Sequence, residues 1–518
     1  MARRLLSWSL ILGLVALSLT GCGGTPSVPA PSDGTLTIVV GDTPLCDVLS
    51  FRTLVTALSV TRENGGTVSV IPANSSIWVD YAALSDTSTI LAQAATLGSG
   101  TYTQGTLTVA APTMSIFDPT VSPPVDVVTP TFTTETINFN INPPLVVTEG
   151  QVSVLKVDFN LPESVESTQQ GQLNVTGTPG ALTVKVTPVV TGTPLVASGN
   201  QGFGNMDDVY GYVLSVSSTY ASAKFTGSFV LQLLSGLSTV TPGGGPSVTV
   251  NLTKNTQLIG TPALNQLTTE SFAAVDGYLD TDGDFVAKSA TIENREDIDS
   301  NVTAFLGPIL SITKDSSGNV TQLTMSVRDE EPNTGASDGG NPVDLDTPPV
   351  IVNIPASTGF YFASPATNFA NNTPDSSYLA VGEQVVVHGS YVPPPTVTAP
   401  ATPPPVTMTA EDIYIPLQTV PGNFISLISA GSDSVTGGFL FTPCPQIFRG
   451  QPIYVFTSGG LNPVTNLPET QFLNVNGLSG LTAPPQLFVR GLLFYDLNGS
   501  VINGVSVPSG SYVLLAET

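Results

Sequence analysis

The sequence predicts an all-β protein, and three observations support this fold class. Gly and Pro, with 49 and 44 copies in 518 residues, separate short runs rich in Val, Thr, Leu and Phe, such as "GTLTIVV" and "GALTVKVTPVV". Runs of this kind between turn residues are typical of strands. Beyond residue 205 one order of strand-like elements recurs three times, and repeats of this length with several short strands fit small β-barrels or compact sandwiches.

The N-terminus has the pattern of a bacterial lipoprotein signal. Two arginines precede an apolar run at residues 5–19, which is too short to span a bilayer, and the run ends in "LTGC" at Cys22. We expect residues 1–21 to be removed and Cys22 to carry lipid, because two or three acyl chains hold a protein stably on a membrane. An ordinary secretory signal with a chance cysteine is the alternative. Residues 22–33, rich in Gly, Pro and Ser, then form a flexible tether.

The charge balance restricts the possible partners. Removal of the two signal-peptide arginines from 14 basic residues leaves 12, against 39 acidic residues. So acidic a surface repels phosphate backbones, which excludes nucleic-acid binding. We therefore expect contact with a membrane through the N-terminal lipid, and a glycan or an envelope protein as partner. Gly23 after the cysteine favours the outer membrane by the retention rule of lipoprotein sorting.

The first domain is predicted to span residues 34–200. Its motifs are an opening strand and turn with Gly34, Leu36, Asp42 and Pro44, then "GTYTQ" at 100–104 and "LKVDFNL" at 155–161. In these motifs the sequence resembles a bacterial domain-of-unknown-function family, number 4382, found at the N-terminus of secreted lipoproteins. The resemblance implies a β-sandwich-like exported domain and carries over no catalytic residue.

Two segments of this first domain are predicted to depart from strand structure. The run from Ser85 to Leu97 is expected to form a short helix ended by Gly98. The stretch from Pro119 to Pro130, rich in Pro and Val, is expected to be a loop or internal hinge.

Three repeats are predicted at residues 205–298, 302–415 and 418–518. Each has an opening glycine, a Thr-x-(Leu/Phe) element and a Val-x-Gly element; these are Gly211, Gly307 and Gly422, then Thr256, Thr358 and Thr470, then residues 275–277, 387–389 and 489–491. Each copy resembles a second family, number 5666, which occurs in tandem in exported proteins. That family ends in Ala-x-x-Ile, which the first copy keeps loosely as Ala287 to Ile292 and the second keeps as Ala410 to Ile413, whereas the third copy departs with "GSYVLLAE". Residues 393–405 add a stiff Pro-rich loop to the second copy.

The stretch "YLDTDGDFVA" places Asp280, Asp282 and Asp284 around one glycine. A calcium loop of the EF type needs Gly at its sixth position and Glu at its twelfth, where this sequence has Phe285 and Thr291. Asp-Gly is instead a favoured central pair of a type I′ hairpin turn. We expect a solvated hairpin whose aspartates point apart along two strands. Weak calcium binding is the alternative, and no other cofactor is indicated.

Candidates for catalysis or ligand binding are few. His388 is the sole histidine and lies in a strand-like run, and the sequence has no Gly-x-Ser-x-Gly, His-Glu-x-x-His or phosphate-loop motif. No catalytic residue is predicted. Trp78 alternates with the apolar residues of "IWVDY" and could be an outward platform for a sugar ring, or could pack beneath the expected helix. Cys46 and Cys444 either form a disulfide or stay as free thiols.

These observations predict a lipid-anchored, extracytoplasmic envelope protein without enzymatic activity, acting in surface structure, adhesion or ligand binding. A carbohydrate-binding accessory lipoprotein is the first alternative. A polysaccharide hydrolase with a carboxylate pair is the second, because the spacing of such a pair is spatial and leaves no sequence motif.

Overall fold

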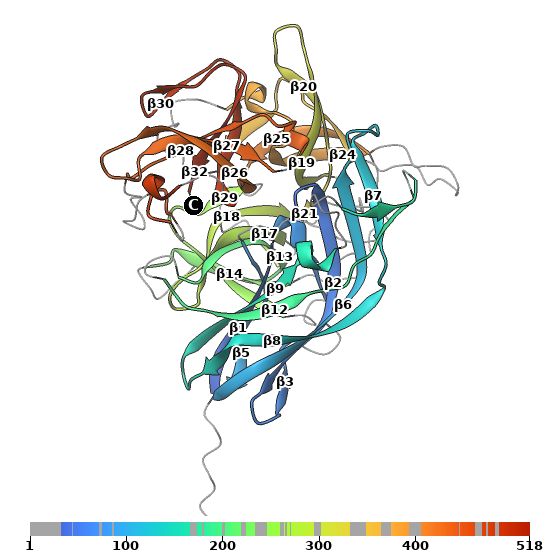
Figure 1. The fold of residues 1–518 in the computed structure, drawn as a ribbon, viewed down its shortest axis with the longest axis vertical. Helices are drawn as coiled ribbons and strands as arrows, with labels where there is room; N and C mark the ends of the chain where they lie inside the picture. Colours follow the sequence, from blue (N-terminus) through green and yellow to red (C-terminus); the bar gives the residue numbers. More distant parts are fainter. Residues whose placement is uncertain are drawn as a thin grey trace, which may run out of the picture.

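The computed structural model confirms the all-β fold (Figure 1). It describes residues 33–43, 45–71, 75–84, 87–165, 173–178, 181–198, 202–218, 224–233, 246–259, 264, 267–269, 271–294, 302–331, 349–363, 374–392, 406–444, 446–460, 469–472, 475–481 and 486–517. Within these ranges, no helix has the length and apolar character that a bilayer crossing requires. Cys22 and the Pro-rich loop at 393–405 lie outside the described residues.

The N-terminal module is one 12-stranded sheet, in which aromatic side chains of strands β2 and β9 pack against each other. Phe51 on one half of the sheet lies 5.5 Å from Phe159 on the other, between ring centres, and Tyr81 lies 4.5 Å from Phe159. The predicted β-sandwich-like domain is thus a single folded-over sheet. Its elements are β1 (Asp33–Thr43), β2 (Val48–Arg62), β3 (Thr67–Ser69), β4 (Ile77–Asp80), η1 (Tyr81–Ala83), β5 (Thr89–Gly98), β6 (Gly100–Phe117), β7 (Val125–Pro130), β8 (Thr134–Val147), β9 (Val152–Asn160), α2 (Leu161–Ser164), β10 (Val175–Thr176), β11 (Leu182–Val184) and β12 (Val190–Leu195).

Two predictions for this module were wrong. Of the segment expected to be helical, residues 89–98 form strand β5, which pairs antiparallel with β1 and buries Ile90 and Leu91. Helix propensity is a weak preference that tertiary pairing overrides. Of the stretch expected to be a loop, Val125–Pro130 forms β7, which pairs with β6 and β11.

Three five-stranded barrels follow. In each barrel, the first of the five main strands pairs with the second and the fourth (β13 with β14 and β17, β19 with β20 and β24, β26 with β27 and β29). The third main strand closes the ring by parallel pairing with the fifth (β15 with β18, β22 with β25, β28 with β32). The sequence left small barrels and compact sandwiches as alternatives for the repeats, and the structure shows that they are barrels. Barrel 1 contains β13 (Gly204–Ser217), β14 (Gly227–Leu233), β15 (Ser247–Leu252), β16 (Gln257–Ile259), β17 (Ser271–Leu279) and β18 (Phe285–Asn294).

Barrels 2 and 3 follow the same plan with short additions. Barrel 2 contains β19 (Val302–Lys314), β20 (Val320–Met325), β21 (Asp329–Glu331), β22 (Val350–Asn353), β23 (Gly359–Phe362), η5 (Ser376–Tyr378), β24 (Gln384–Val392) and β25 (Thr407–Ile415). Barrel 3 contains β26 (Leu417–Ala430), β27 (Gly437–Pro443), η6 (Gln446–Phe448), β28 (Ile453–Thr457), η7 (Leu478–Gly480), β29 (Gln486–Asp496), β30 (Val501–Ile502), β31 (Val505–Ser506) and β32 (Ser511–Ala516).

The residues that define the repeat perform the same structural task in every barrel. A Cβ at the opening glycine would overlap a carbonyl oxygen of the second strand or of the residue directly after it (Gly211, Gly307 and Gly422). A Cβ at the Val-x-Gly glycine would overlap a carbonyl oxygen of the last strand (Gly277, Gly389 and Gly491). Each repeat threonine donates its hydroxyl to an alanine carbonyl on the last strand: Thr256 to Ala287 at 2.8 Å, Thr358 to Ala410 at 3.1 Å and Thr470 to Ala516 at 2.5 Å. Close strand approach and this hydrogen bond therefore explain the repeated pattern.

The third copy, whose ending "GSYVLLAE" was expected to depart from the family pattern, nevertheless has the last strand of the barrel. Ala516 accepts the same threonine hydrogen bond as Ala287 and Ala410, and β32 closes barrel 3. The hydrogen bond uses the backbone carbonyl of the alanine.

The hydrophobic cores of the modules run into one another. Buried residues of the N-terminal module and of barrel 1 form one continuous cluster, whereas barrel 2 shares a cluster with Phe494 and Val513 of barrel 3. Leu49 of the N-terminal module packs into the core of barrel 3. Figure 1 shows barrel 1 between the strands β9 and β12 of the N-terminal module and the strands of barrel 3. The four modules therefore form one body.

Candidate functional site at the junction of the modules

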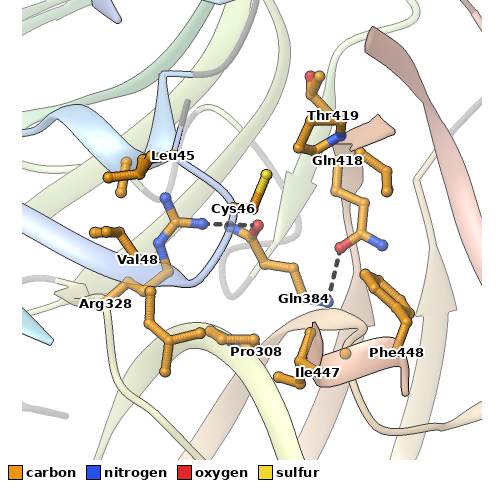
Figure 2. Close-up of a pocket in the computed structure, with 15 residues that line it drawn as sticks. Leu45, Cys46, Val48, Pro308, Arg328, Gln384, Gln418, Thr419, Ile447 and Phe448 are labelled. Carbon is orange, nitrogen blue, oxygen red and sulfur yellow. Dashed lines mark hydrogen bonds between the residues drawn. The ribbon is translucent and has the colours of Figure 1, made fainter. Parts of the chain in front are cut away.

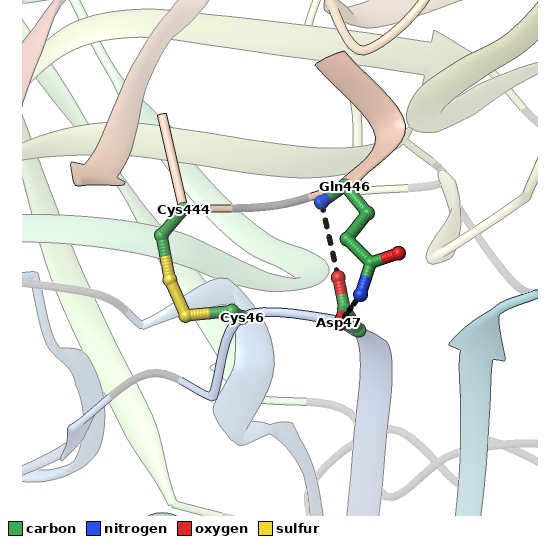
Figure 3. The surroundings of a disulfide bond; sticks show 4 residues. All are labelled: Cys46, Asp47, Cys444 and Gln446. Atoms are coloured by element: carbon green, nitrogen blue, oxygen red, sulfur yellow. Dashed lines mark hydrogen bonds between the residues drawn. A yellow bond between two sulfur atoms is a disulfide. The ribbon is translucent and has the colours of Figure 1, made fainter. Parts of the chain in front are cut away.

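A disulfide joins the N-terminal module to barrel 3 (Figure 3). Cys46, just before β2, bonds to Cys444 after β27, and their Cα atoms are 5.4 Å apart, within the range of ordinary disulfides. Beside it, Asp47 accepts hydrogen bonds from the backbone N–H of Gln446 at 3.0 Å and from its side-chain amide at 2.9 Å. Burial raises the pKa of Asp47, while these bonds to Gln446 oppose the rise.

A cluster of charged side chains, here called the ionic junction, joins barrel 1 to barrel 3. Arg490 of β29, with a side chain only 3% exposed, donates to Asp207 of β13 at 3.3 Å. Lys288 of β18 donates to Glu517 at 2.6 Å and to Asn205 at 3.2 Å. The ionic junction thus consists of the charged residues Asp207, Lys288, Arg490 and Glu517.

The ion pairs of the ionic junction shift the pKa values of its charged groups. Burial alone would raise the pKa of Asp207, but Arg490 and the other neighbours hold it below the ordinary value. The pKa of Glu517 is likewise lowered, because Lys288 and Arg490 outweigh its burial. Burial would lower the pKa of Arg490, yet the surrounding acids raise it. The pairing thus favours the charged forms of Asp207, Arg490 and Glu517.

No role was predicted for the middle residue of the Val-x-Gly element, although the sequence contained a sign that this position can form a buried ion pair. Arg490 is the x residue of the third copy, and Asp276, the x residue of the first, lies near enough to help raise the pKa of Arg490. In a strand that is otherwise apolar, such as "LFVRGLLF", one buried arginine indicates an internal partner. The partner could not be identified, because it comes from another barrel.

Glu383 is a second charged group that the sequence did not reveal. It has no exposed surface, and its Oε2 accepts from the backbone N–H of Ala380 at 3.0 Å. Its Oε1 has no hydrogen-bond partner among the described residues. Burial raises the pKa of Glu383 well above the ordinary value, although the Ala380 hydrogen bond and Lys314 oppose this. Burial therefore favours the neutral, protonated form of this carboxyl.

The substitution Glu383→Gln is expected to flatten the pH dependence of stability. A raised folded-state pKa contributes stability that is complete below the unfolded-state pKa and is lost as pH rises through the folded-state pKa, at about 1.4 kcal/mol for each unit of difference. The variant should thus gain free energy of unfolding relative to the natural protein as pH rises above about 4.3, the pKa of an ordinary glutamate, because glutamine never ionises. Urea titrations across this range measure the effect. Parallel curves for the two proteins would show that Glu383 ionises freely.

The acidic hairpin differs from both expectations made for it. The carboxylates of Asp280, Asp282 and Asp284 do not point apart, because one oxygen from each lies within 4.8 Å of the others. The turn is not type I′, since only Gly283, at φ +80°, has a positive φ. Instead the backbone N–H of Asp280 donates to the carbonyl of Asp284 at 2.9 Å, which closes a three-residue loop with glycine in the left-handed position.

A lysine supplies the cation of this acidic hairpin. Lys224 makes ion pairs with Asp280 and, at 3.2 Å, with Asp282. Asp280 Oδ1 also accepts from the backbone N–H of Asp282 at 2.8 Å and of Asp284 at 3.0 Å. The same arrangement recurs at Asp315, whose Oδ1 accepts two backbone N–H groups at 2.8 and 3.0 Å. The aspartates are thus explained by turn formation and by Lys224.

The structure places Trp78 against an arginine. As predicted, Ile77, Val79 and Tyr81 are buried, and Trp78 points to the other side of β4. The guanidinium carbon of Arg52 lies 5.2 Å from the centre of the Trp78 ring, so this cation covers one ring face. The helix once expected above Trp78 is absent from residues 87–98, where the chain forms a strand. Half-buried His388 lies on β24, opposite Asp412 of β25.

A cavity of about 100 Å³ lies beside the disulfide, where three modules meet (Figure 2). The N-terminal module, barrel 2 and barrel 3 all contribute to its wall: Leu45, Cys46, Val48, Leu49 and Ala82; Pro308, Arg328, Gly382 and Gln384; and Gln418, Thr419, Val420, Pro421, Ile447 and Phe448. Ligand sites are commonly found between domains. This cavity was not predicted, because its wall combines segments far apart in the sequence.

Residues 33–176 match the model of a domain of unknown function, DUF4382, which covers most of the N-terminal module. Residues 226–290 match a second domain of unknown function, DUF5666. Both resemblances seen in the sequence are thereby confirmed, in the expected order. No curated protein matches the chain.

The DUF5666 match covers most of barrel 1. It includes Thr256, Gly277 and Ala287 of barrel 1, which form the threonine hydrogen bond and the close strand approach. It also includes the acidic hairpin with Asp280. Barrels 2 and 3 have the strand order of this DUF5666 barrel.

Proposed function

We propose that the protein is a lipid-anchored component of the bacterial cell envelope, held on the outer membrane through Cys22. The lipoprotein signal supports this anchor. The Cys46–Cys444 disulfide supports an extracytoplasmic location, because such bonds persist in oxidising compartments. The role that fits best is structural, adhesive or ligand-binding, with an envelope protein or glycan as the partner.

One observation carries the non-enzymatic part of this proposal: the charged groups of the ionic junction are paired with one another. Arg490 neutralises Asp207, and Lys288 neutralises Glu517. The repeat threonines and glycines are likewise used to hold strands together. Charged side chains and threonines that are engaged in these contacts stabilise a rigid body and are not free for proton transfer or nucleophilic attack.

Metabolic labelling with palmitate tests the anchor. The natural protein is expected to incorporate label and to enter the detergent phase of a Triton X-114 extraction, whereas Cys22→Ser loses both properties. A Gly23→Asp variant serves as the matched control, because it keeps the acylated cysteine but is expected to move to the inner membrane by the retention rule. Detergent partitioning that persists in Cys22→Ser would refute the proposed anchor. Turnover of any polysaccharide by the purified protein would refute the non-enzymatic role.

A further inference from the structure

One outer face of the N-terminal module carries rows of uncharged side chains, nearly all of them polar. The inward side chains of β2, β6 and β8, such as Leu58, Leu107 and Ile137, are buried in the core. Alternation along each strand turns their neighbours to the opposite side, where every one is half-buried or exposed. The pairing register aligns these neighbours in three rows, here called the hydroxyl face: Ala57, Thr108 and Thr136; Ser69, Ser59, Thr106 and Asn138; and Thr67, Thr61, Gln104 and Asn140.

A fourth row gives the hydroxyl face an apolar border with an aromatic ring. Trp78 of β4 lies opposite Leu54 of β2, and Leu54 lies opposite Ala110 of β6. Trp78 points outward because its neighbours Ile77 and Val79 are buried, and residues opposite one another in a sheet share a face. The border row follows directly on the row that contains Thr108 in the pairing register. The hydroxyl face thus combines hydrogen-bonding rows with one apolar edge.

The composition of the hydroxyl face restricts its partner. Its rows, all within the described residues, contain no charged side chain, although the whole chain has 39 acidic and 14 basic residues. The rest of the surface would repel an anionic partner and would attract a cationic one to other sites. The cores of protein interfaces are rich in aromatic residues and Arg and poor in Ser, unlike these rows. Hydroxyl groups both donate and accept, as the hydroxyls of a sugar do.

We propose that the hydroxyl face binds an uncharged, extended β-linked polysaccharide. Neighbouring strands are about 4.8 Å apart, close to the length of one pyranose unit in such a chain, so consecutive sugars meet consecutive strands. Side chains of the polar rows hydrogen-bond to sugar hydroxyls, and the apolar face of a sugar packs at the border with Trp78.

Contacts within the hydroxyl face prepare it for such a ligand. Thr106 donates to Oδ1 of Asn138 at 2.9 Å, and the hydroxyls of Thr61 and Thr67 lie 2.9 Å apart. Side chains that are already fixed in this way lose less entropy when a ligand binds. The inference rests on the ligand-binding role proposed above and names the class of ligand.

Two soluble cellulose derivatives with the same backbone test the proposal. Hydroxyethylcellulose is neutral, and carboxymethylcellulose is anionic. Residues 22–518 carrying Cys22→Ser form an acidic protein that migrates readily in a native gel, and hydroxyethylcellulose cast into the gel is expected to retard it. Carboxymethylcellulose should bind at least about 10-fold more weakly, because its charge is repelled. Unretarded migration in hydroxyethylcellulose, or equal retardation by the two polymers, would overturn the proposal.

The decisive variant is Thr108→Arg, which places a long cation in the middle of the hydroxyl face. It is expected to bind hydroxyethylcellulose at least about 10-fold more weakly than the natural protein, because the ligand would have to displace a solvated charge. Thr321→Arg is the matched control, since it makes the same change at an exposed strand position of barrel 2. Equal retardation of the two variants would contradict binding at this face.

The emission of Trp78 gives a measurement that needs no variant. Trp78 is the sole tryptophan after residue 21, and bound hydroxyethylcellulose is expected to shift its emission to shorter wavelengths by excluding water. Emission that stays unchanged at saturating polymer would place the binding elsewhere and would refute the proposal. Loss of the lipid anchor is detected separately, by palmitate labelling, so failure of the polysaccharide site and failure of the anchor are distinguishable.

Discussion

Replacing Arg490 with methionine is expected to destabilise the protein by about 3–5 kcal/mol, the usual result of removing one partner of a buried ion pair. Arg490 is the buried cation between Asp207 and Glu517, and its loss leaves Asp207 with an unpaired charge. Methionine keeps most of the apolar stem, so the effect reports the charge. Urea unfolding followed by intrinsic fluorescence measures the change.

Arg449→Met is the matched control, because this exposed arginine has no part in the ionic junction, and a change within about 0.5 kcal/mol is expected. Adding Asp207→Asn to Arg490→Met should recover part of the lost stability, since the stranded charge disappears. An Arg490→Met variant as stable as the natural protein would show that the junction is solvated. Acidification should weaken the natural junction in the same way, because stability from acids with lowered pKa values is lost as pH falls through them.

Removing the disulfide by Cys46→Ser with Cys444→Ser is expected to cost about 2–4 kcal/mol. The bond closes a loop of 398 residues and fastens the N-terminal module to barrel 3, so its loss increases the freedom of the unfolded chain. Urea titration of the variant should show the N-terminal module separating at lower denaturant than barrel 3. The natural protein should unfold in steps that coincide more closely.

Treatment with dithiothreitol provides the control for the cysteine substitutions. Reduction of the natural protein should reproduce the behaviour of the double variant, and the double variant should not respond to the reagent. Equal stability of oxidised and reduced protein would contradict a bond that holds the two modules together.

The sequence predicted the parts of this fold that depend on local pattern. The repeat glycines and threonines could be found because each copy uses the glycines for the same close approach of strands and the threonine for the same hydrogen bond. The helix expected at 85–97 was wrong because local propensity favoured it, whereas pairing with β1 decided the outcome. A hairpin was correctly expected at Asp280, but the turn type and the role of Lys224 depend on a side chain 56 residues away.

The candidate site could not be predicted, for a related reason. Arg328, Gln384 and Gln418 occupy three separate segments, and only the packing of barrels 2 and 3 against the N-terminal module brings them together. A pairing of Cys46 with Cys444 was one of two alternatives, and the distance of almost 400 residues between them in the sequence favoured free thiols, whereas the structure has the disulfide. Contacts between modules leave no periodic pattern in the chain, so the sequence revealed the modules and not their junction.

Small-angle X-ray scattering on the soluble chain carrying Cys22→Ser tests the central claim most directly, that four β modules form one body. For a compact body of this length the radius of gyration is about 23 Å, and the scattering should have the bell-shaped Kratky profile of a single globule. A clearly larger radius with the profile of several linked globules would contradict the account, because the disulfide and the ionic junction would then fail to hold the modules together.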